Sequence, residues 1–204
     1  MVGTVHIVDD DTSFMTAVKR LLETAGYRAK TYPSAQQFLD QRPDEGEPGC
    51  ILLDAKLPGL SGPELQIRLS ELGATLPIVF VSGYTDIRGT VRAIKAGAED
   101  FLTKPVKAEE LLTVVGKALA QHTNSRASNA EQETLRARLT ALTPRERQVF
   151  ELVVRGQMNK QIARQLGTAE RTIKAHRQRI MEKMRVRSVA ELVSIAARLG
   201  VLGE

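Results

Sequence analysis

The sequence predicts an α/β domain with a doubly wound, five-stranded parallel sheet, followed by an all-α domain of four helices with a helix-turn-helix. Two observations lead to this fold class. Within residues 1–120, five short apolar runs alternate with five stretches of helical periodicity, which is typical of a parallel sheet covered on both faces. Residues 121–204 have helical patterns only, and they carry 16 Lys and Arg against 8 Asp and Glu, whereas residues 1–120 carry 13 against 16.

The elements of the first part follow from the apolar runs and from helix punctuation. Ser34 with Gln37 and Ser61 with Glu64 have the spacing of capping boxes, which mark the beginnings of two helices. The expected strands are 4–8, 28–32, 50–53, 78–81 and 100–102, and the expected helices are 12–25, 34–41, 61–72, 86–96 and 107–120. We therefore assign residues 1–120 to one domain.

Residues 121–140 are expected to form a partly helical linker. The polar stretch 122–129 interrupts the helical pattern, and a second helix begins near Glu131. Its apolar stripe of Leu135, Leu139 and Leu142 could pack on either domain or pair in a dimer.

Residues 141–204 are expected to form the second domain. Thr143 and Glu146 form a capping box with Pro at the first helical position. Two short helices joined by a tight turn at Gly167, the second rich in Arg and Lys, indicate a helix-turn-helix. The expected helices run from Pro144 to about Arg155, over 159–166, over 169–184 with Thr168 as N-cap, and onward from Ser188.

Composition narrows the class of protein. The single cysteine, Cys50, excludes an internal disulfide, so a reducing cytoplasm is expected. No stretch approaches the roughly 18 apolar residues of a membrane span, and no secretory signal is expected. The three histidines lie far apart without other cysteines, so no zinc site is predicted. The basic second part predicts contact with a polyanion.

Three carboxylates are expected to meet at one edge of the sheet. Asp9 and Asp10 end the first strand and Asp54 ends the third. In a doubly wound sheet of order 2-1-3-4-5 these strands are neighbours, and their carboxyl ends border the topological switch point. Oxygen ligands of this kind suit Mg²⁺. Asp11, by contrast, is expected to begin the first helix.

Two further strand ends supply complementary groups. The fourth strand ends in the hydroxyl of Ser82, and the fifth leads to Lys104 and Pro105. A hydroxyl, an ammonium and Mg²⁺ around a carboxylate form a site suited to an acyl phosphate on that carboxylate.

Residues 1–120 resemble the receiver domain of bacterial two-component response regulators, which has a flavodoxin-like fold. The matching motifs are Val8-Asp9-Asp10, Asp54 followed by Leu57-Pro58-Gly59, Ser82, and Lys104-Pro105. The resemblance implies that Asp54 is phosphorylated, and that Mg²⁺ binds Asp10, Asp54 and the backbone carbonyl of Lys56, with Asp9 acting mostly through water. It implies that Ser82, Lys104 and Phe101 sense the phosphoryl group, and that the Lys104–Pro105 peptide is cis.

Two departures flank the phosphorylation site. Lys56 and Tyr84 are both large, and in related receivers these positions tune the rate of hydrolysis. We expect the two side chains to obstruct water, so that the phosphorylated state is long-lived.

Helical phase separates the faces of the helix at 169–184. Ile173, Ile180 and Met184 are spaced for the core. The face expected in a DNA major groove contains Arg171, Lys174, Ala175 and Gln178, and the residues expected at phosphates are Lys160, Arg177 and Arg179. Phase alone leaves a protein-binding helical bundle as an alternative.

Residues 143–200 are similar to the LuxR-type helix-turn-helix domain through Leu142-Thr-Pro-Arg-Glu146, Asn159-Lys-Gln-Ile-Ala163, Thr172-Ile-Lys174, His176 and Lys183-Met184. The combination resembles transcriptional regulators of the FixJ/NarL type. It implies a sensor histidine kinase as phosphodonor, promoter DNA and RNA polymerase as partners, and a homodimer on phosphorylation. No catalysis is expected beyond phosphorylation and dephosphorylation of Asp54.

The surface expected to dimerise is the exposed side of the fourth helix. Its basic residues are Arg88, Arg92 and Lys95, and Asp100 is one of the acidic residues that a two-fold axis could bring opposite them.

Two other classes of protein remain open at this stage. In a phosphatase of the haloacid dehalogenase type, Asp9 would be the nucleophile and Asp11 the acid/base, although Ser13 replaces the usual residue and Asp54 has no role. A DNA-binding protein with a vestigial receiver is the other alternative, and the complete set of receiver residues disfavours it.

Overall fold

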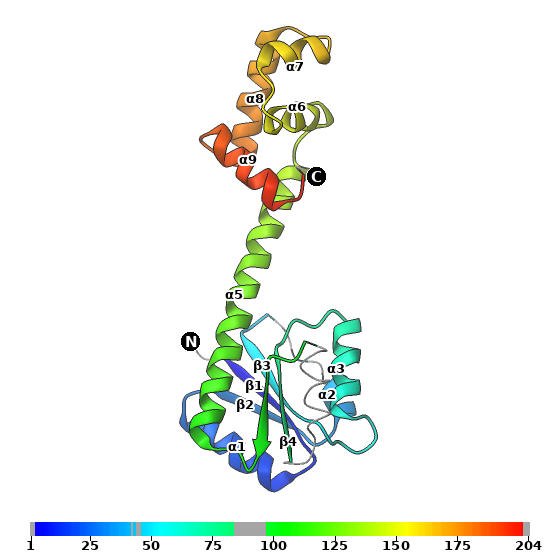
Figure 1. Cartoon of the computed structure of the whole chain (residues 1–204), viewed down its shortest axis with the longest axis vertical. Coiled ribbons are helices and arrows are strands. Elements are labelled where there is room, and N and C mark those ends of the chain that lie inside the picture. The colour runs from blue at the N-terminus through cyan, green and yellow to red at the C-terminus, as the bar shows by residue number, and fades with distance from the viewer. Residues whose placement is uncertain (1–2, 42, 44–45, 84–96, 202–204) are drawn as a thin grey trace. The chain divides into compact units, whose positions relative to one another are not determined.

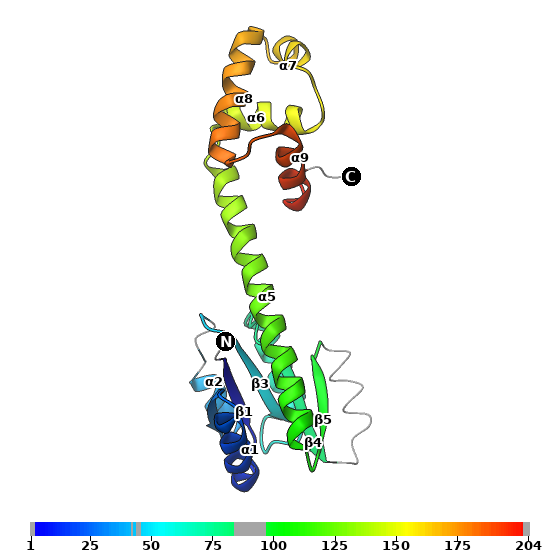
Figure 2. The same ribbon diagram turned by 90° about the vertical axis from the view of Figure 1, so that its left-hand side faces the viewer.

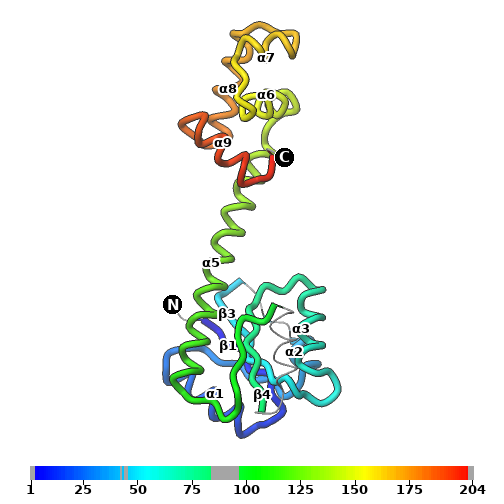
Figure 3. Tube along the Cα trace, viewed as in Figure 1, coloured from blue at the N-terminus to red at the C-terminus, as the bar shows by residue number. Residues whose placement is uncertain are grey.

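The computed structural model describes residues 3–41, 43, 46–83 and 97–201. Two compact units make up the chain, Met1–Ser125 and Arg126–Glu204, and the boundary between them falls within one helix, α5 (Figure 1). Figure 3 follows the path of the chain through each unit.

The first unit contains a five-stranded parallel sheet in the order β2-β1-β3-β4-β5, which confirms the predicted topology. Strands β1, β3 and β4 are buried along nearly their whole length, because helices cover both faces of the sheet. The strands are Thr4–Val8 (β1), Arg28–Tyr32 (β2), Gly49–Asp54 (β3), Ile78–Gly83 (β4) and Asp100–Lys104 (β5).

Helices α1 (Thr12–Thr24) and α5 (Ala108–Thr140) cover one face, and α2 (Ala35–Asp40) and α3 (Gly62–Glu71) cover the other (Figure 2). Side chains alternate between two apolar clusters along the strands, so that Leu52 faces α1 and α5 while Leu53 faces α2 and α3. The expected helix at 86–96 lies outside the described residues.

Helix ends follow the predicted punctuation. Asp11 is the N-cap of α1, and its side chain accepts hydrogen bonds from the backbone N–H groups of Ser13 and Phe14. In α3 the Glu64 side chain accepts from the Ser61 N–H, as a capping box requires. The cap at Asp11 turns the chain into α1 directly after the end of β1.

The predicted interruption at 122–129 is wrong, because α5 is one helix of 33 residues from Ala108 to Thr140. The polar stretch contains neither Gly nor Pro, so nothing in it prevents a helix. Hydroxyl groups of Thr123 and Thr134 donate to helix carbonyls four residues earlier. Polar side chains are therefore accommodated on the helix and do not end it.

His122, which the sequence placed in a polar linker, is buried in the first unit. Its Nδ1 accepts a hydrogen bond of 3.0 Å from the backbone N–H of Gly49, and its Nε2 lies 3.3 Å from Thr75 Oγ1. Because Gly49 begins β3, this histidine joins α5 to the amino ends of the strands.

The second unit contains the end of α5 and four further helices: α6 (Pro144–Val154), α7 (Asn159–Gln165), α8 (Glu170–Met184) and α9 (Val189–Arg198). The predicted stripe of Leu135, Leu139 and Leu142 is buried, and the last two join the apolar core of this unit. The stripe therefore packs within its own chain. Among the described helices, none combines the length and the apolar character needed to cross a membrane.

The N-cap predicted for α8 is wrong by one residue. Ala169, not Thr168, occupies the N-cap position, and it makes no side-chain hydrogen bond. The Thr168 N–H donates to the Ala163 carbonyl, so Thr168 belongs to the turn that closes α7. At the following helix the prediction is confirmed, because the Ser188 side chain accepts from the Glu191 N–H.

Candidate functional site

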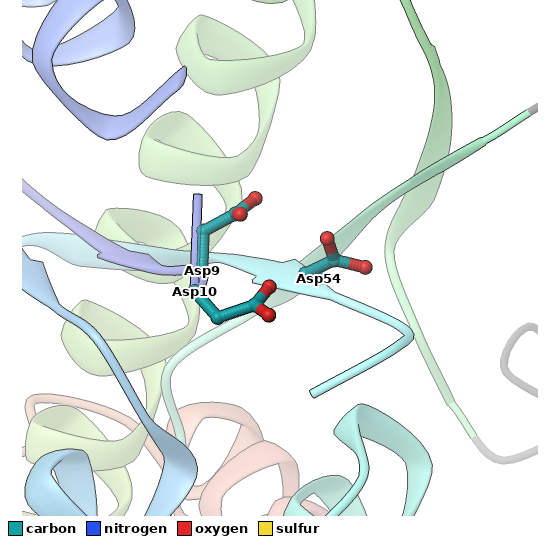
Figure 4. Close-up of side chains that lie close together, drawn as sticks. All are labelled: Asp9, Asp10 and Asp54. Atoms are coloured by element: carbon teal, nitrogen blue, oxygen red, sulfur yellow. The ribbon is translucent and has the colours of Figure 1, made fainter. Parts of the chain in front are cut away.

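Three carboxylates meet where β1 and β3 end side by side. Val8 pairs with Leu53 in the parallel register, so Asp9 and Asp10 follow β1 next to Asp54 at the end of β3. Each side chain offers a carboxylate oxygen, and these oxygens all lie within 4.8 Å of one another (Figure 4). The predicted convergence of these residues is confirmed.

Lys104 lies between two of these carboxylates. Its Nζ donates to Asp9 Oδ2 at 2.6 Å and to Asp54 Oδ2 at 2.7 Å. The remaining oxygens bind backbone groups: Asp9 Oδ1 accepts from the Asp11 N–H and Asp54 Oδ1 accepts from the Lys56 N–H. The Lys104–Pro105 peptide is cis, as the resemblance implied.

The electrostatics of the site depend on burial and on Lys104. Asp9 is only 1% exposed, and burial raises the pKa of its carboxyl group, partly offset by the hydrogen bond from Lys104. Burial alone would lower the pKa of Lys104, but the hydrogen bonds to Asp54 and Asp9, together with the attraction of the two carboxylates, raise the pKa above its ordinary value. The ammonium thus neutralises part of the charge that three neighbouring carboxylates concentrate here.

The donor set fits Mg²⁺. Carboxylate oxygens are the ligands that this cation prefers, and it keeps several waters in its coordination shell. Asp9 and Asp54 are buried, whereas Asp10 is exposed, so the cluster is open to solvent on one side. The first unit therefore contains an acidic cluster that is compatible with Mg²⁺.

A buried hydroxyl lies at the end of the neighbouring strand. Val81 of β4 pairs with Asp54, and Ser82 follows it, fully buried. Its Oγ has no hydrogen-bond partner among the described residues. A buried hydroxyl without a partner costs free energy, so this position favours a ligand that supplies an acceptor.

The aromatic ring of Phe14 was missed by the sequence reasoning. Lys104 Nζ lies 4.3 Å from its ring centroid, which is within the range of a cation–π contact. Phe14 is the third residue of α1, and the Asp11 cap sets the direction in which this first turn leaves β1. The only available signal was an aromatic residue shortly after the carboxylates.

The other predicted residues of the first unit stand as follows. Phe101 is partly buried against the apolar cluster under α2 and α3, and Lys56 is exposed beside Asp54. The Asp100 side chain accepts from the Phe101 N–H. Four of the predicted residues, Tyr84, Arg88, Arg92 and Lys95, lie outside the described part of the chain. The role of Lys56 and Tyr84 in slowing hydrolysis and the dimer surface therefore stay predictions.

Asp11 does not join the carboxylate cluster. Its side chain caps α1, and the cluster contains Asp9, Asp10 and Asp54. An acid/base role for Asp11, which the phosphatase alternative required, therefore has no support in the structure.

Helices α7 and α8 form a helix-turn-helix on the core of the second unit. Ile162 of α7 and the predicted core residues Ile173, Ile180 and Met184 of α8 are buried together. Arg177 Nη1 donates to Asn159 Oδ1 at 3.0 Å and so links α8 to the first residue of α7. Arg177 is therefore engaged within the protein, which was not foreseen.

The residues predicted to contact DNA lie on the surface of this unit. The exposed ones are Lys160, Arg171, Lys174, Ala175, Gln178 and Arg179. Gln178 Nε2 also donates to Glu182 Oε1 at 3.1 Å, one turn further along α8. An open hollow of about 550 Å³ lies between the beginnings of α7 and α8, and Lys160 and Lys174 line it.

A partly buried ion pair joins α8 of the helix-turn-helix to α6. Lys183 of α8 donates to Glu146 Oε2 at 2.7 Å, and the Glu146 side chain is only 4% exposed. The bond from Lys183, followed by the capping bond from the Thr143 N–H, lowers the pKa of Glu146 to about 2. Glu146 thus caps α6 and fixes α8 against it.

This ion pair makes the stability of the second unit depend on pH. The pKa of Glu146 is lower in the folded state than in the unfolded state, so its contribution is complete above about pH 4.5 and is lost as the pH falls toward 2. At pH 7 we expect Glu146→Gln to reduce the free energy of unfolding by about 1–3 kcal/mol, and the difference from the parent to shrink below pH 4.5. Urea unfolding, monitored through the NMR signals of α6 and α8, measures this difference in the free energy of unfolding.

Glu151→Gln is the matched control, because the side chain of Glu151 in α6 is 43% exposed and pairs with Arg147 only at 3.7 Å. Its effect should be close to zero at every pH. A Glu146→Gln effect that stays constant from pH 7 to pH 3 would contradict the assignment.

Comparisons with known proteins give a family for each of the two units. Residues 5–116 match the family model of the response regulator receiver domain, and residues 140–196 match that of bacterial regulatory proteins of the luxR family. The chain is 42% identical over 197 residues to the response regulator protein TmoT of Ectopseudomonas mendocina, covering 96% of this chain and 88% of TmoT. It is 37% identical over 202 residues to the transcriptional regulatory protein FixJ of Bradyrhizobium diazoefficiens, covering 99% and 98% of the two chains.

Solved structures give the same result. The structure of the response regulator StyR aligns with a TM-score of 0.88 at 42% identity, covering 97% of this chain and all of the StyR chain. Full-length FixJ from B. japonicum aligns with a TM-score of 0.60 at 36% identity, covering 98% of both chains. The chain therefore belongs to the two-component response regulators that join a receiver domain to a LuxR-type DNA-binding domain, and it is a FixJ-like regulator of transcription.

Proposed function

We propose that this regulator accepts a phosphoryl group on Asp54 from a sensor histidine kinase, dimerises, and binds promoter DNA through α8. The observation that carries the proposal is that Asp54 lies in one cluster with the carboxylates of Asp9 and Asp10 and accepts a hydrogen bond from Lys104 Nζ. We place the reaction in the cytoplasm, with RNA polymerase as a further partner.

In the proposed transfer, one carboxylate oxygen of Asp54 forms a bond to phosphorus while the bond from phosphorus to the donor histidine nitrogen breaks. The electron pair of that bond goes to the nitrogen, so no further reactant is needed. Mg²⁺, held by Asp9, Asp10, Asp54 and the Lys56 carbonyl, would supply positive charge to the phosphoryl oxygens. Lys104 would then pair with the phosphoryl group, and the Ser82 hydroxyl would donate to it.

For DNA, the proposed roles divide between base contacts and phosphate contacts. Lys174 and Gln178, with Arg171 and Ala175, lie on the exposed face of α8 that would enter the major groove. Lys160 and Arg179 would contact phosphates, which position the protein without reading sequence.

The test is binding to duplex DNA selected by the chain from a random pool, with acetyl phosphate and Mg²⁺ present. Phosphodonor should tighten binding of the parent and leave Asp54→Asn unchanged. Lys174→Ala should reduce the preference for selected over random duplex by about 5–150-fold, since a good base contact contributes ~1–3 kcal/mol. Lys160→Ala should weaken binding to both duplexes equally.

A parent protein whose affinity does not respond to phosphodonor, although Asp54 is labelled, would contradict signal transfer and favour the vestigial receiver. Equal preferences in Lys174→Ala and the parent would contradict the groove assignment.

A further inference from the structure

Glu170 is an acidic residue surrounded by basic side chains. It is the first residue of α8, it is exposed, and it lines the open hollow between the beginnings of α7 and α8. The other charged residues that line this hollow, Lys160, Lys174 and Arg177, are all cationic. A carboxylate at this position would face any nucleic acid that the cations attract.

Glu170 and Lys174 have the spacing of a helical ion pair, with the acidic residue first, which is the favourable order. Within residues 97–201, however, no ion pair joins Glu170 to Lys174 or to another residue. Two other pairs involve residues of α8, Gln178 with Glu182 and Lys183 with Glu146, and neither includes Glu170 or Lys174. Glu170 and Lys174 are therefore both open to a ligand.

The chemistry of DNA limits what the Glu170 carboxylate can contact. Two unit charges of equal sign at 4 Å repel by about 1 kcal/mol even in bulk water, and by more near a protein surface, so a phosphate is a poor neighbour. In the major groove only exocyclic amino groups offer hydrogen-bond donors, and Glu accepts from N4 of cytosine. The first residues of a recognition helix are the ones that reach base edges.

We propose that Glu170 is a specificity-determining residue that accepts a hydrogen bond from the N4 amino group of a cytosine in the operator. Lys174, one turn along the same side of α8, donates to a neighbouring guanine or phosphate. The carboxylate also excludes thymine and guanine from its position, because their major-groove edges present acceptors that it would repel. The inference rests on the proposed placement of α8 in the major groove.

The experiment is selection from a randomised duplex pool by the full-length chain with acetyl phosphate and Mg²⁺, followed by sequencing. The parent should enrich cytosine at one position of each half-site. Glu170→Ala should lose this preference by about tenfold at that position alone, while the other positions stay enriched. Glu170→Gln, which keeps the size of the side chain, should move the preference to adenine, the base that Gln reads best.

Identical enriched sequences for the parent and both Glu170 variants would overturn the inference, and tighter binding of Glu170→Ala to all duplexes would then assign Glu170 a purely repulsive role. Lys174→Ala distinguishes a wrong role for Glu170 from a wrong placement of α8. If Lys174→Ala alters the enriched sequence and the Glu170 variants do not, only the role of Glu170 fails. If none of these variants alters it, the placement of α8 fails as well.

Discussion

Asp54→Asn is expected to abolish phosphorylation. Incubated with Mg²⁺ and labelled acetyl phosphate, the parent should gain one acid-stable, hydroxylamine-labile phosphoryl group, the behaviour of an acyl phosphate. Asparagine has the same shape but no anionic oxygen, so it provides no nucleophile, and the label should fall to background. The Asp54 side chain receives hydrogen bonds from Lys104 Nζ and the Lys56 N–H, and the amide oxygen can accept only one of them well.

Asp11→Asn is the matched control, because Asp11 caps α1 without joining the carboxylate cluster and asparagine caps a helix equally well. This variant should be labelled like the parent. Asp10→Ala should be labelled only at higher Mg²⁺ concentration. Undiminished label on Asp54→Asn, mapped to Asp9, would contradict the assignment and favour the phosphatase chemistry.

Lys104→Met is expected to destabilise the receiver domain in the absence of divalent cations and to make its stability depend on Mg²⁺. Removal of the ammonium leaves the buried Asp9 carboxylate and the Asp54 carboxylate without their shared cation. Breaking a buried pair in this way costs ~3–5 kcal/mol, and since Lys104 is 23% exposed we expect about 2–3 kcal/mol. A divalent cation that binds the folded state should restore stability according to its concentration relative to its Kd.

Lys56→Met provides the comparison, since Lys56 is an exposed lysine next to Asp54 and forms no ion pair among the described residues. Its unfolding in EDTA should match that of the parent within about 0.5 kcal/mol. Urea titrations in EDTA and in about 10 mM MgCl₂ give the free energy of unfolding without and with the divalent cation. A Lys104→Met protein that is as stable as the parent in EDTA would show that the carboxylates do not need this cation.

The sheet and the carboxylate cluster could be predicted because their signals are local. Each buried strand is a short apolar run, and each helix has its own periodicity and caps, so the order of elements can be read along the chain. Parallel strands present their carboxyl ends at one edge, which brings Asp9, Asp54 and Lys104 together from three separate segments. The convergence of these three residues could be predicted because it depends only on the order of the strands in the sheet.

The contacts that the sequence did not reveal join residues far apart in the chain without a repeating pattern. His122 binds the backbone of Gly49, and Phe14 lies against the Lys104 ammonium, yet neither residue type has a preferred partner that sequence could indicate. The interruption expected at 122–129 was wrong for a related reason. Polarity suggested a loop, but α5 continues through this stretch, which lacks helix-breaking residues.

By itself, the sequence determined the order of strands and helices, the division of charge between the two parts, and the identity of the groups at the strand ends. Only the tertiary structure decided how those groups are used. It showed Lys104 hydrogen-bonded to two carboxylates at once, Glu146 buried against Lys183, and Glu170 left unpaired in the hollow beside Lys174. The physical reason is that periodicity and capping act over a few residues, whereas burial and charge pairing depend on distances that only the folded chain sets.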